Sequence, residues 1–246
     1  MRVPRLYLDQ PLALQQAVLL DKEASHYLTR VLRLRERAKV ILFNGAGGEY
    51  LATLTATAPN ATLLPEYFTE PLSESPLILH LAQGISRGER MHYAIQKAVE
   101  LGVSTIQPIV SRYCEVKLDQ ERSSKRQLHW QGVAKSAAEQ SGRTQLTPIL
   151  PAVKLADWLT QTAPSPDHIG LVLDPRSTTR LSQLPAEPPC EVTLLIGPEG
   201  GLDETEIDNA VQAGFSTIQL GPRVLRTETA AVCALAAINL MWGDFR

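Results

Sequence analysis

From residue 77 onward, short apolar runs alternate with helical patterns, and this alternation constrains the fold more than any other feature of the chain. The apolar runs that we predict as strands cover residues 77–83, 105–110, 169–174, 192–196 and 217–220. The helical patterns between and after them cover residues 89–101, 120–140, 155–162, 204–213 and 230–242. Regular alternation of this kind is typical of a mostly parallel sheet with helices on both faces. The sequence therefore predicts an α/β domain.

The N-terminal part of the chain has a different pattern. A short strand is predicted near residues 3–8 and a helix over residues 21–34. The run 40–43, the turn at Asn44 and the alternating run 49–57 together predict a β-hairpin. The glycines of this turn also resemble a dinucleotide-binding loop, but Tyr50 occupies the third glycine position and a strand pattern follows. We therefore expect a small β-rich domain, joined to the rest by a linker near residues 69–75.

Composition excludes several classes of protein. The 246 residues include 24 basic and 26 acidic side chains, and charge and apolar content are those of a globular chain. The three cysteines, Cys114, Cys190 and Cys233, form no Cys-x-x-Cys pair, so we expect neither a disulfide framework nor a metal site. The longest apolar run, 230–240, is too short to span a bilayer, and no signal-peptide pattern occurs. A cytoplasmic protein without membrane contact is expected.

Charge is distributed unevenly along the chain. Residues 22–39 hold six basic and two acidic side chains, and residues 112–143 hold seven basic and four acidic ones. Residues 187–246 hold three basic and nine acidic side chains. Two basic zones on a mildly acidic chain are consistent with a polyanion bound by part of the surface, or with solvated helix faces.

Two glycine-proline loops each follow a predicted strand and precede a predicted helix. The first is Ile196-Gly-Pro-Glu-Gly-Gly-Leu202, followed by Asp203 as an N-cap with Glu206 as its reciprocal partner. Its glycines allow a ligand to approach the main chain, although a tight connector is the alternative. The second is Leu220-Gly-Pro-Arg-Val-Leu-Arg-Thr-Glu-Thr-Ala230, whose polar residues could be functional or could simply cap a helix. Because ligands of open α/β sheets bind beyond strand ends, the two loops could line one crevice.

These two strings, in this order, resemble the SPOUT superfamily of methyltransferases, and within it the RsmE family. Further stretches agree with this resemblance: Arg87-Gly-Glu-Arg-Met91, Gln96-Lys-Ala-Val-Glu-Leu-Gly-Val103, Ser111-Arg-Tyr-Cys-Glu-Val116, and the stretch from Trp130 through Ala138-Glu-Gln-Ser-Gly-Arg143. The resemblance covers nearly the whole chain and is loosest at the N-terminus. Arg87 stands where the family pattern has lysine, which keeps the charge but changes how phosphate is bound.

The resemblance implies a fold, a reaction and partners. It implies a trefoil-knotted α/β domain over residues 73–246 and a PUA-like RNA-binding barrel over residues 1–72. It implies S-adenosylmethionine as cofactor, a homodimer, and methylation of N3 of a uridine in 16S ribosomal RNA of the small ribosomal subunit. The alternatives are a SPOUT enzyme for another RNA, a non-catalytic RNA-binding assembly protein that keeps the fold, and a nucleotide-dependent oxidoreductase, against which the missing third glycine argues.

The resemblance and the chemistry together give a set of site residues. The main chain and side chains expected to bind the cofactor belong to Leu173, Ile196, Gly197, Pro198, Glu199, Gly200, Gly201, Leu220, Gly221, Val224, Leu225, Thr227, Thr229 and Ala230. Arg226 is the candidate for stabilising a uracil anion, because its guanidinium stays charged, and either Glu199 or Glu228 could accept the N3 proton. The arginines expected to contact RNA are Arg2, Arg5, Arg30, Arg33, Arg35, Arg87, Arg90, Arg112 and Arg143.

Overall fold

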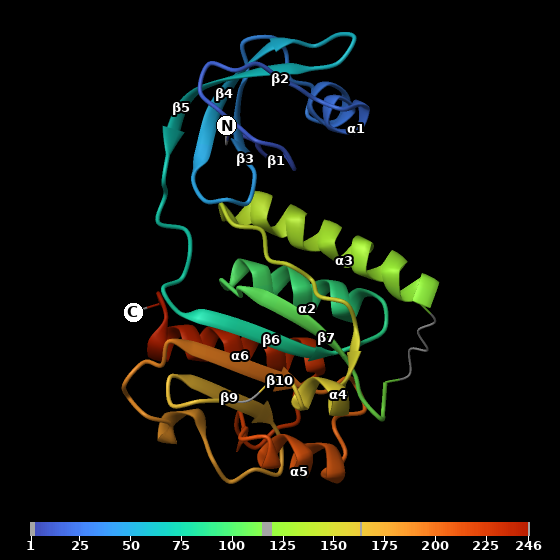
Figure 1. Cartoon of the computed structure of the whole chain (residues 1–246), viewed down its shortest axis with the longest axis vertical. Coiled ribbons are helices and arrows are strands. Elements are labelled where there is room, and N and C mark those ends of the chain that lie inside the picture. The colour runs from blue at the N-terminus through green and yellow to red at the C-terminus, as the bar shows by residue number, and fades with distance from the viewer. Residues whose placement is uncertain (1–2, 115–119, 163, 246) are drawn as a thin grey trace. The chain divides into compact units, whose positions relative to one another are not determined.

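The computed structural model describes residues 3–114, 120–162 and 164–245 (Figure 1). The chain forms two compact units. The first contains Met1–Glu74 together with Ala138–Leu146, and the second contains Ser75–Ala137 and Thr147–Arg246. The first unit therefore takes in a short segment from the middle of the chain as well as the N-terminal part.

The first unit is built on a five-stranded sheet. In the order in which they pair, its strands are β1 (Arg5–Tyr7), β3 (Lys39–Phe43), β4 (Glu49–Ala56), β5 (Thr62–Thr69) and β2 (Val18–Leu19). Strands β3 and β4 pair antiparallel, so the predicted hairpin is confirmed, while β1 runs parallel to β3. Alternate side chains of these strands, among them Val40, Leu42, Leu54 and Leu63, form a buried core.

Two features of this unit differ from the predictions. The proline-rich region contains β5, which we did not predict; the pairing of β5 with β4 shifts register near Pro65, so the ladder accommodates a residue without an N–H. The predicted helix 21–34 is shorter: α1 (Lys22–His26) passes into a π-helical turn at Tyr27–Val31. There the Thr29 hydroxyl donates to the Ser25 carbonyl, which competes with the regular backbone ladder, and Arg33 adopts a positive φ of 54°.

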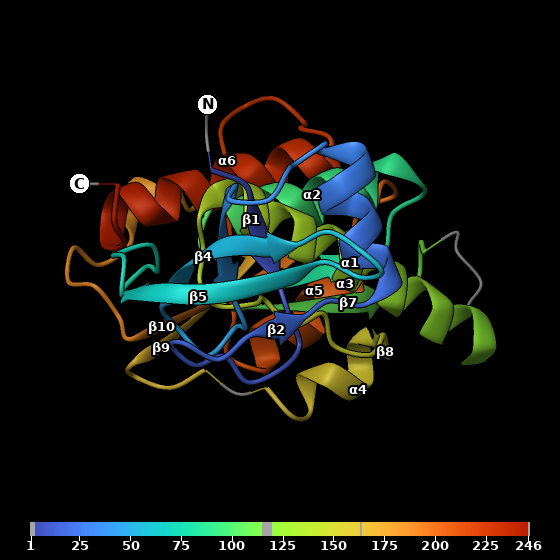
Figure 2. The same ribbon diagram turned by 90° about the horizontal axis from the view of Figure 1, so that it is seen from above.

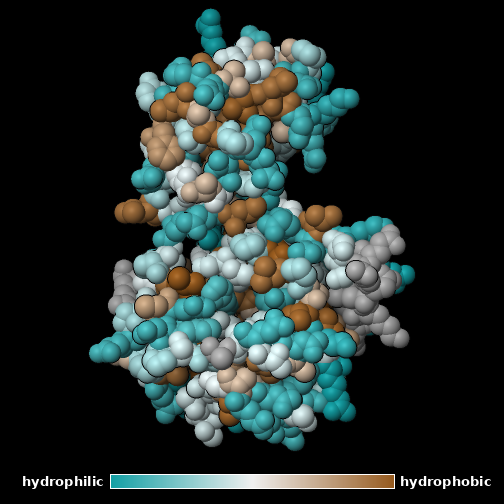
Figure 3. Space-filling model, viewed as in Figure 1, coloured by the Kyte–Doolittle hydropathy of each residue, from teal (hydrophilic) through white to brown (hydrophobic). Residues whose placement is uncertain are grey.

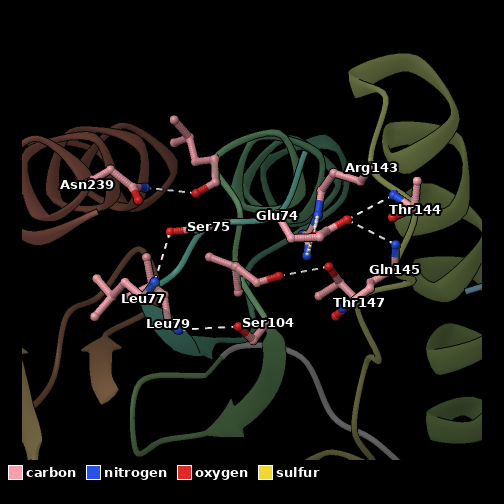
Figure 4. Close-up of polar contacts among 12 residues, drawn as sticks. Glu74, Ser75, Leu77, Leu79, Ser104, Arg143, Thr144, Gln145, Thr147 and Asn239 are labelled. Atoms are coloured by element: carbon pink, nitrogen blue, oxygen red, sulfur yellow. Dashed lines mark hydrogen bonds and ion pairs between the residues drawn. The ribbon is translucent and has the colours of Figure 1, made fainter. Parts of the chain in front are cut away.

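A cluster of ion pairs holds the segment Ala138–Leu146 in the first unit. The Arg143 guanidinium contacts Glu74 through Nε (2.8 Å) and Nη2 (2.7 Å). The other Glu74 oxygen accepts the backbone N–H groups of Thr144 (2.8 Å) and Gln145 (3.0 Å), as Figure 4 shows. Arg5 donates to the Arg143 carbonyl at 2.8 Å and also pairs with Glu49.

The second unit is a six-stranded sheet in which every pair of neighbouring strands is parallel. In spatial order its strands are β11 (Ser216–Ile218), β9 (His168–Leu173), β10 (Glu191–Ile196), β6 (Ile78–Gly84), β7 (Thr105–Val110) and β8 (Val153–Lys154). Its helices are α2 (Glu89–Glu100), α3 (Gln120–Ser141, which ends in the first unit), α4 (Leu155–Leu159), α5 (Glu204–Gln212) and α6 (Thr227–Trp242), and a 3-10 turn covers Leu181–Gln183. The predicted α/β class is confirmed.

Helices cover both faces of this parallel sheet. Helices α2 and α6 pack against each other on one side, and α4 and α5 lie on the other (Figure 2). On the second side, Trp158 of α4 packs against Phe215 with their ring centroids 5.6 Å apart. Both belong to a buried cluster that includes Val172 and Leu195 of the sheet. The central strands are buried, which explains their nearly continuous apolar sequences.

No helix among the described residues is long and apolar enough to cross a bilayer. On the face of the second unit shown in Figure 3, hydrophilic residues predominate and hydrophobic residues occur in small groups.

Candidate active site

A cavity of about 490 Å³ lies in the second unit, at the carboxyl ends of β9, β10 and β11. These three strands are neighbours in the sheet, so the loops that follow them meet at one edge. The loop after β9 contributes Asp174 and Arg176, the loop after β10 contributes residues 197–202, and the loop after β11 contributes residues 219–221 and 223–226. The two glycine-proline turns singled out in the sequence therefore line one cavity.

Close packing explains one glycine of the first turn and one beside it. A Cβ on Gly84, at the end of β6, would lie 2.4 Å from the Pro198 nitrogen, and one on Gly200 would lie 2.7 Å from the Tyr113 Cβ. The turn then ends in the predicted capping box: Asp203 accepts the Glu206 N–H at 2.8 Å, and Glu206 accepts the Asp203 N–H at 3.1 Å. The turn is thus held by close packing at Pro198 and by the capping box at Asp203.

A buried hydroxyl links the two turns directly. The Thr227 Oγ1 donates to the Gly197 carbonyl at 2.7 Å and accepts from Gln83 Nε2 at 2.9 Å. Thr227 is the first residue of α6, but no side-chain hydrogen bond caps this helix. Residues 226–229 therefore do not cap α6 through a side chain, as the alternative interpretation of this string required. Thr227 instead joins the turn after β11 to the turn after β10.

Glu199 is held by groups at the start of α2. Its Oε1 accepts the Arg87 backbone N–H at 2.9 Å and the Arg90 guanidinium at 2.9 Å. Burial raises the pKa of Glu199, but the hydrogen bonds from the Arg87 and Glu199 backbone N–H groups and from Arg90 outweigh it and lower the pKa overall. The Glu199 carboxylate is therefore charged, and the hydrogen bonds that it accepts hold the turn in place.

Arg226 and Glu228 lie where two cavities of the second unit meet. Both line the cavity just described and also a second, wider cavity of about 850 Å³, and Arg90 is the third residue that the two cavities share. Among the described atoms, Glu228 Oε2 is buried and has no hydrogen-bond partner. A buried carboxylate oxygen without a partner is costly for the fold, which makes it a candidate for contact with a substrate.

Nearly all residues expected to bind the cofactor line the first cavity. Thirteen of the fourteen lie there, and the exception, Thr229, lines the second cavity. Asp174, Arg176, Gln219 and Arg223 also line the first cavity and were not expected. The signal for Asp174 and Arg176 was available, because Asp174 ends the predicted strand 169–174 and Arg176 lies just beyond it, where ligand-contacting residues concentrate.

The nine arginines expected to contact RNA differ in where the structure places them. Arg30, Arg33 and Arg35 are exposed in the first unit; Arg87, Arg90 and Arg112 are exposed in the second; and Arg2 lies outside the described residues. Arg112 remains 67% exposed while its Nη1 contacts Asp203 at 2.6 Å.

Two of the expected RNA contacts are placed unfavourably for that role. The side chains of Arg5 and Arg143 are only 7% and 6% exposed and are engaged in the ion pairs with Glu49 and Glu74. Their expected role in RNA binding is not supported by this placement, because their guanidinium groups are already paired with partly buried carboxylates.

Comparisons with known proteins show the family to which this fold belongs. An RNA methyltransferase domain family matches residues 73–239, and an RNA methyltransferase PUA domain family matches residues 20–63. The chain is similar to the ribosomal RNA small subunit methyltransferase E of Buchnera aphidicola (36% identity, 99% of this chain and 98% of the relative) and of Bacillus subtilis (31%, 90% and 91%).

Solved structures extend the comparison. A Neisseria gonorrhoeae ribosomal RNA small subunit methyltransferase E bound to S-adenosyl methionine has a TM-score of 0.91 at 36% identity, covering 100% of both chains. A methyltransferase from Legionella pneumophila, in complex with the same cofactor, has a TM-score of 0.93 at 36% identity, again over 100% of both chains. The fold and the site define an RNA methyltransferase with a PUA domain. More narrowly, the chain belongs to the ribosomal RNA small subunit methyltransferase E family.

Proposed function

We propose that this chain transfers a methyl group from S-adenosylmethionine to N3 of a uridine in 16S ribosomal RNA of the small ribosomal subunit. The names of its relatives support the class of RNA, and the cofactor in two solved relatives supports the donor. The uridine and the N3 position come from the RsmE resemblance. One observation carries the proposal: Arg226 and Glu228 line both the cavity suited to the donor and the cavity beside it.

The first cavity fits a nucleoside-type donor. Its volume of about 490 Å³ is within the usual range for small-molecule sites. Apolar side chains of Leu173, Ile196 and Leu225 line it beside the main chain of the two turns. Gly201 and Gly221 have positive φ values of 73° and 101°, and a Cβ on either would meet no described atom within 4 Å. Backbone N–H and C=O groups can therefore be approached there, which suits the edge of an adenine.

The chain's own side chains would then act on the uracil. Bound S-adenosylmethionine supplies a methyl on a sulfonium, and the electrons of the broken S–C bond stay on sulfur as N3 bonds to the methyl carbon. The imide must first lose its N3 proton, and we assign the acceptor role to Glu228 because its Oε2 has no other described partner. Arg226 stabilises the negative charge that develops on the uracil oxygens. Glu199 holds the turn and is not the base, because its carboxylate already accepts hydrogen bonds from the Arg87 N–H and from Arg90.

The remaining partners follow from the same proposal. Arg30, Arg33, Arg35, Arg87, Arg90 and Arg112 contact RNA phosphates, which position the substrate without reading its sequence. The protein acts in the cytoplasm as a homodimer, and its functional division lies near residue 72, between an RNA-binding domain and a catalytic domain.

Transfer to ribosomal RNA tests the proposal. Small subunits from a strain lacking this chain should gain one methyl on a uridine of 16S ribosomal RNA when incubated with the purified protein and S-adenosylmethionine. Mass mapping of the RNA would locate the product. Methylation of another nucleoside, or of another RNA only, would contradict the proposed reaction.

A further inference from the structure

The second cavity is a groove between three helices of the second unit. Helix α2 presents His92, Tyr93 and Gln96 to it, and α3 presents His129, Gly132, Val133 and Ser136. These positions recur at three- and four-residue steps, so one face of each helix lines the groove. The start of α6 closes one end with Arg226, Glu228 and Thr229.

This groove adjoins the first cavity through shared side chains. Arg90, Arg226 and Glu228 line both. A methyl acceptor must reach the donor from outside the donor's own cavity while contacting the same catalytic side chains. The groove between α2 and α3 meets both conditions.

A glycine in the middle of α3, Gly132, lines this groove. It lies within α3, a helix of 22 residues, where glycine is less favourable than alanine. A Cβ at this position would meet no described atom within 4 Å, so close packing within the chain does not require glycine. The missing side chain instead leaves space in the floor of the groove, where Gly132 is exposed.

The walls have the chemistry of a base-binding site. Tyr93 is 46% exposed, and a base can stack on its ring. His92 and His129 contact each other through their Nε2 atoms at 2.9 Å, and Gln96 and Ser136 add hydrogen-bonding groups. No group of three or more His, Cys, Asp or Glu among the described residues is suited to a metal ion, and this pair of histidines belongs to no such group.

We propose that the groove between α2 and α3 receives the target nucleotide of the RNA, and that Gly132 keeps open the space which that nucleotide occupies. This inference rests on the proposed function and adds the place where the substrate binds. A base removed from its stack has a protein surface to stack on here, and it can reach Arg226 and Glu228 from this side.

Substitution of Gly132 gives the sharpest test. Gly132→Ala should raise the melting temperature by about 2–4 °C through helix propensity. Gly132→Leu should lower kcat/KM for small ribosomal subunits at least about 100-fold, while calorimetry gives a Kd for S-adenosylmethionine within about twofold of the wild type. Leu128→Phe is the matched control, because Leu128 is exposed on the same helix and lines neither cavity; it should leave both quantities within about twofold.

Three outcomes would overturn the groove assignment. In the first, the Gly132→Leu variant methylates small subunits with wild-type efficiency. In the second, the variant no longer binds S-adenosylmethionine. In the third, light scattering shows that the variant has a different oligomeric state, which would make the groove an interface between copies.

A crosslinking experiment tests binding in the groove independently of methyl transfer. RNA of the small subunit that carries 4-thiouridine should, on irradiation with the wild-type protein, crosslink to peptides of α2 or α3. This readout requires no methyl transfer. A chain that crosslinks there without transferring methyl would retain the groove and lose the proposed function, whereas the absence of any crosslink to α2 and α3 would contradict the groove.

Discussion

The Thr227 hydroxyl donates to the Gly197 carbonyl at 2.7 Å, and this one contact joins the turns that follow β10 and β11. Thr227 is buried, and its oxygen also accepts from Gln83, so three segments far apart in the sequence meet at one atom. The first cavity, which we propose for the methyl donor, depends on this junction, because each turn supplies part of its wall.

Removal of that hydroxyl should weaken the site. Thr227→Val keeps the shape of the side chain but leaves the Gly197 carbonyl and the Gln83 amide without this partner. We expect the free energy of unfolding to fall by about 1–3 kcal/mol, and the affinity for S-adenosylmethionine to fall about 10-fold or more, roughly what 1.4 kcal/mol gives. Urea unfolding and calorimetry measure the two effects. Thr227→Ser retains the hydroxyl and should bind like the wild type; equal donor affinity in all three proteins would disprove the link.

The two candidate proton acceptors can be separated by matched substitutions. Glu228→Gln cannot take the N3 proton, so single-turnover methyl transfer should slow by about 10²–10⁴-fold. Glu199→Gln keeps an oxygen for the Arg87 N–H and should slow transfer by less than about 10-fold. If Glu199→Gln proves the more damaging of the two, the assignment of the base to Glu228 is wrong.

Much of the fold could be predicted from the sequence. Strand β7 covers the predicted residues 105–110, and α2 and β10 deviate from their predicted ranges by a residue, because apolar periodicity and glycine stop signals are local. Strand β5 was missed because four prolines between residues 58 and 76 indicated a linker. The placement of residues 138–146 in the first unit depends on the Arg143–Glu74 ion pair, which joins residues far apart in sequence. The trefoil knot stays a prediction from the resemblance.

The candidate site was predictable in part. The two glycine-proline turns were recognised from local sequence, and the neighbouring positions of β9, β10 and β11 bring them together. The roles of single side chains were not predictable, because burial and partners decide them. Thr227 looked like a helix cap and is an inter-turn link, and Arg5 and Arg143 looked like RNA contacts and are buried ion-pair partners.

Binding to RNA should depend on the exposed arginines of the first unit. Replacing Arg30, Arg33 and Arg35 by alanine should weaken binding to small subunits and reduce the slope of log K against log salt by about 2, if each contacts one phosphate of single-stranded RNA. Donor affinity should not change. Arg180→Ala removes an exposed charge from the second unit outside the predicted set and serves as the control. An unchanged salt slope in the triple variant would exclude these arginines as phosphate contacts.

Stability should fall in mild acid because of His80. Burial lowers the pKa of His80 below its ordinary value, although Glu191, whose Oε1 lies 3.0 Å from His80 Nε2, opposes the shift; His168 adds to the lowering. The unfolded chain therefore binds this proton more readily, so the contribution to stability is complete above about pH 6.5 and is lost as the pH falls below it. Urea unfolding at about pH 8 and about pH 5.5 should show a smaller loss for His80→Gln than for the wild type. An identical loss in both proteins would refute the assignment.

The position of the bound donor tests the central claim most directly. A crystal structure of the full chain with S-adenosylmethionine should place the donor against both turns, 197–202 and 219–226, with its methyl group directed towards Arg226 and Glu228. A donor bound at any other place, with these two turns making no contact to it, would contradict the account.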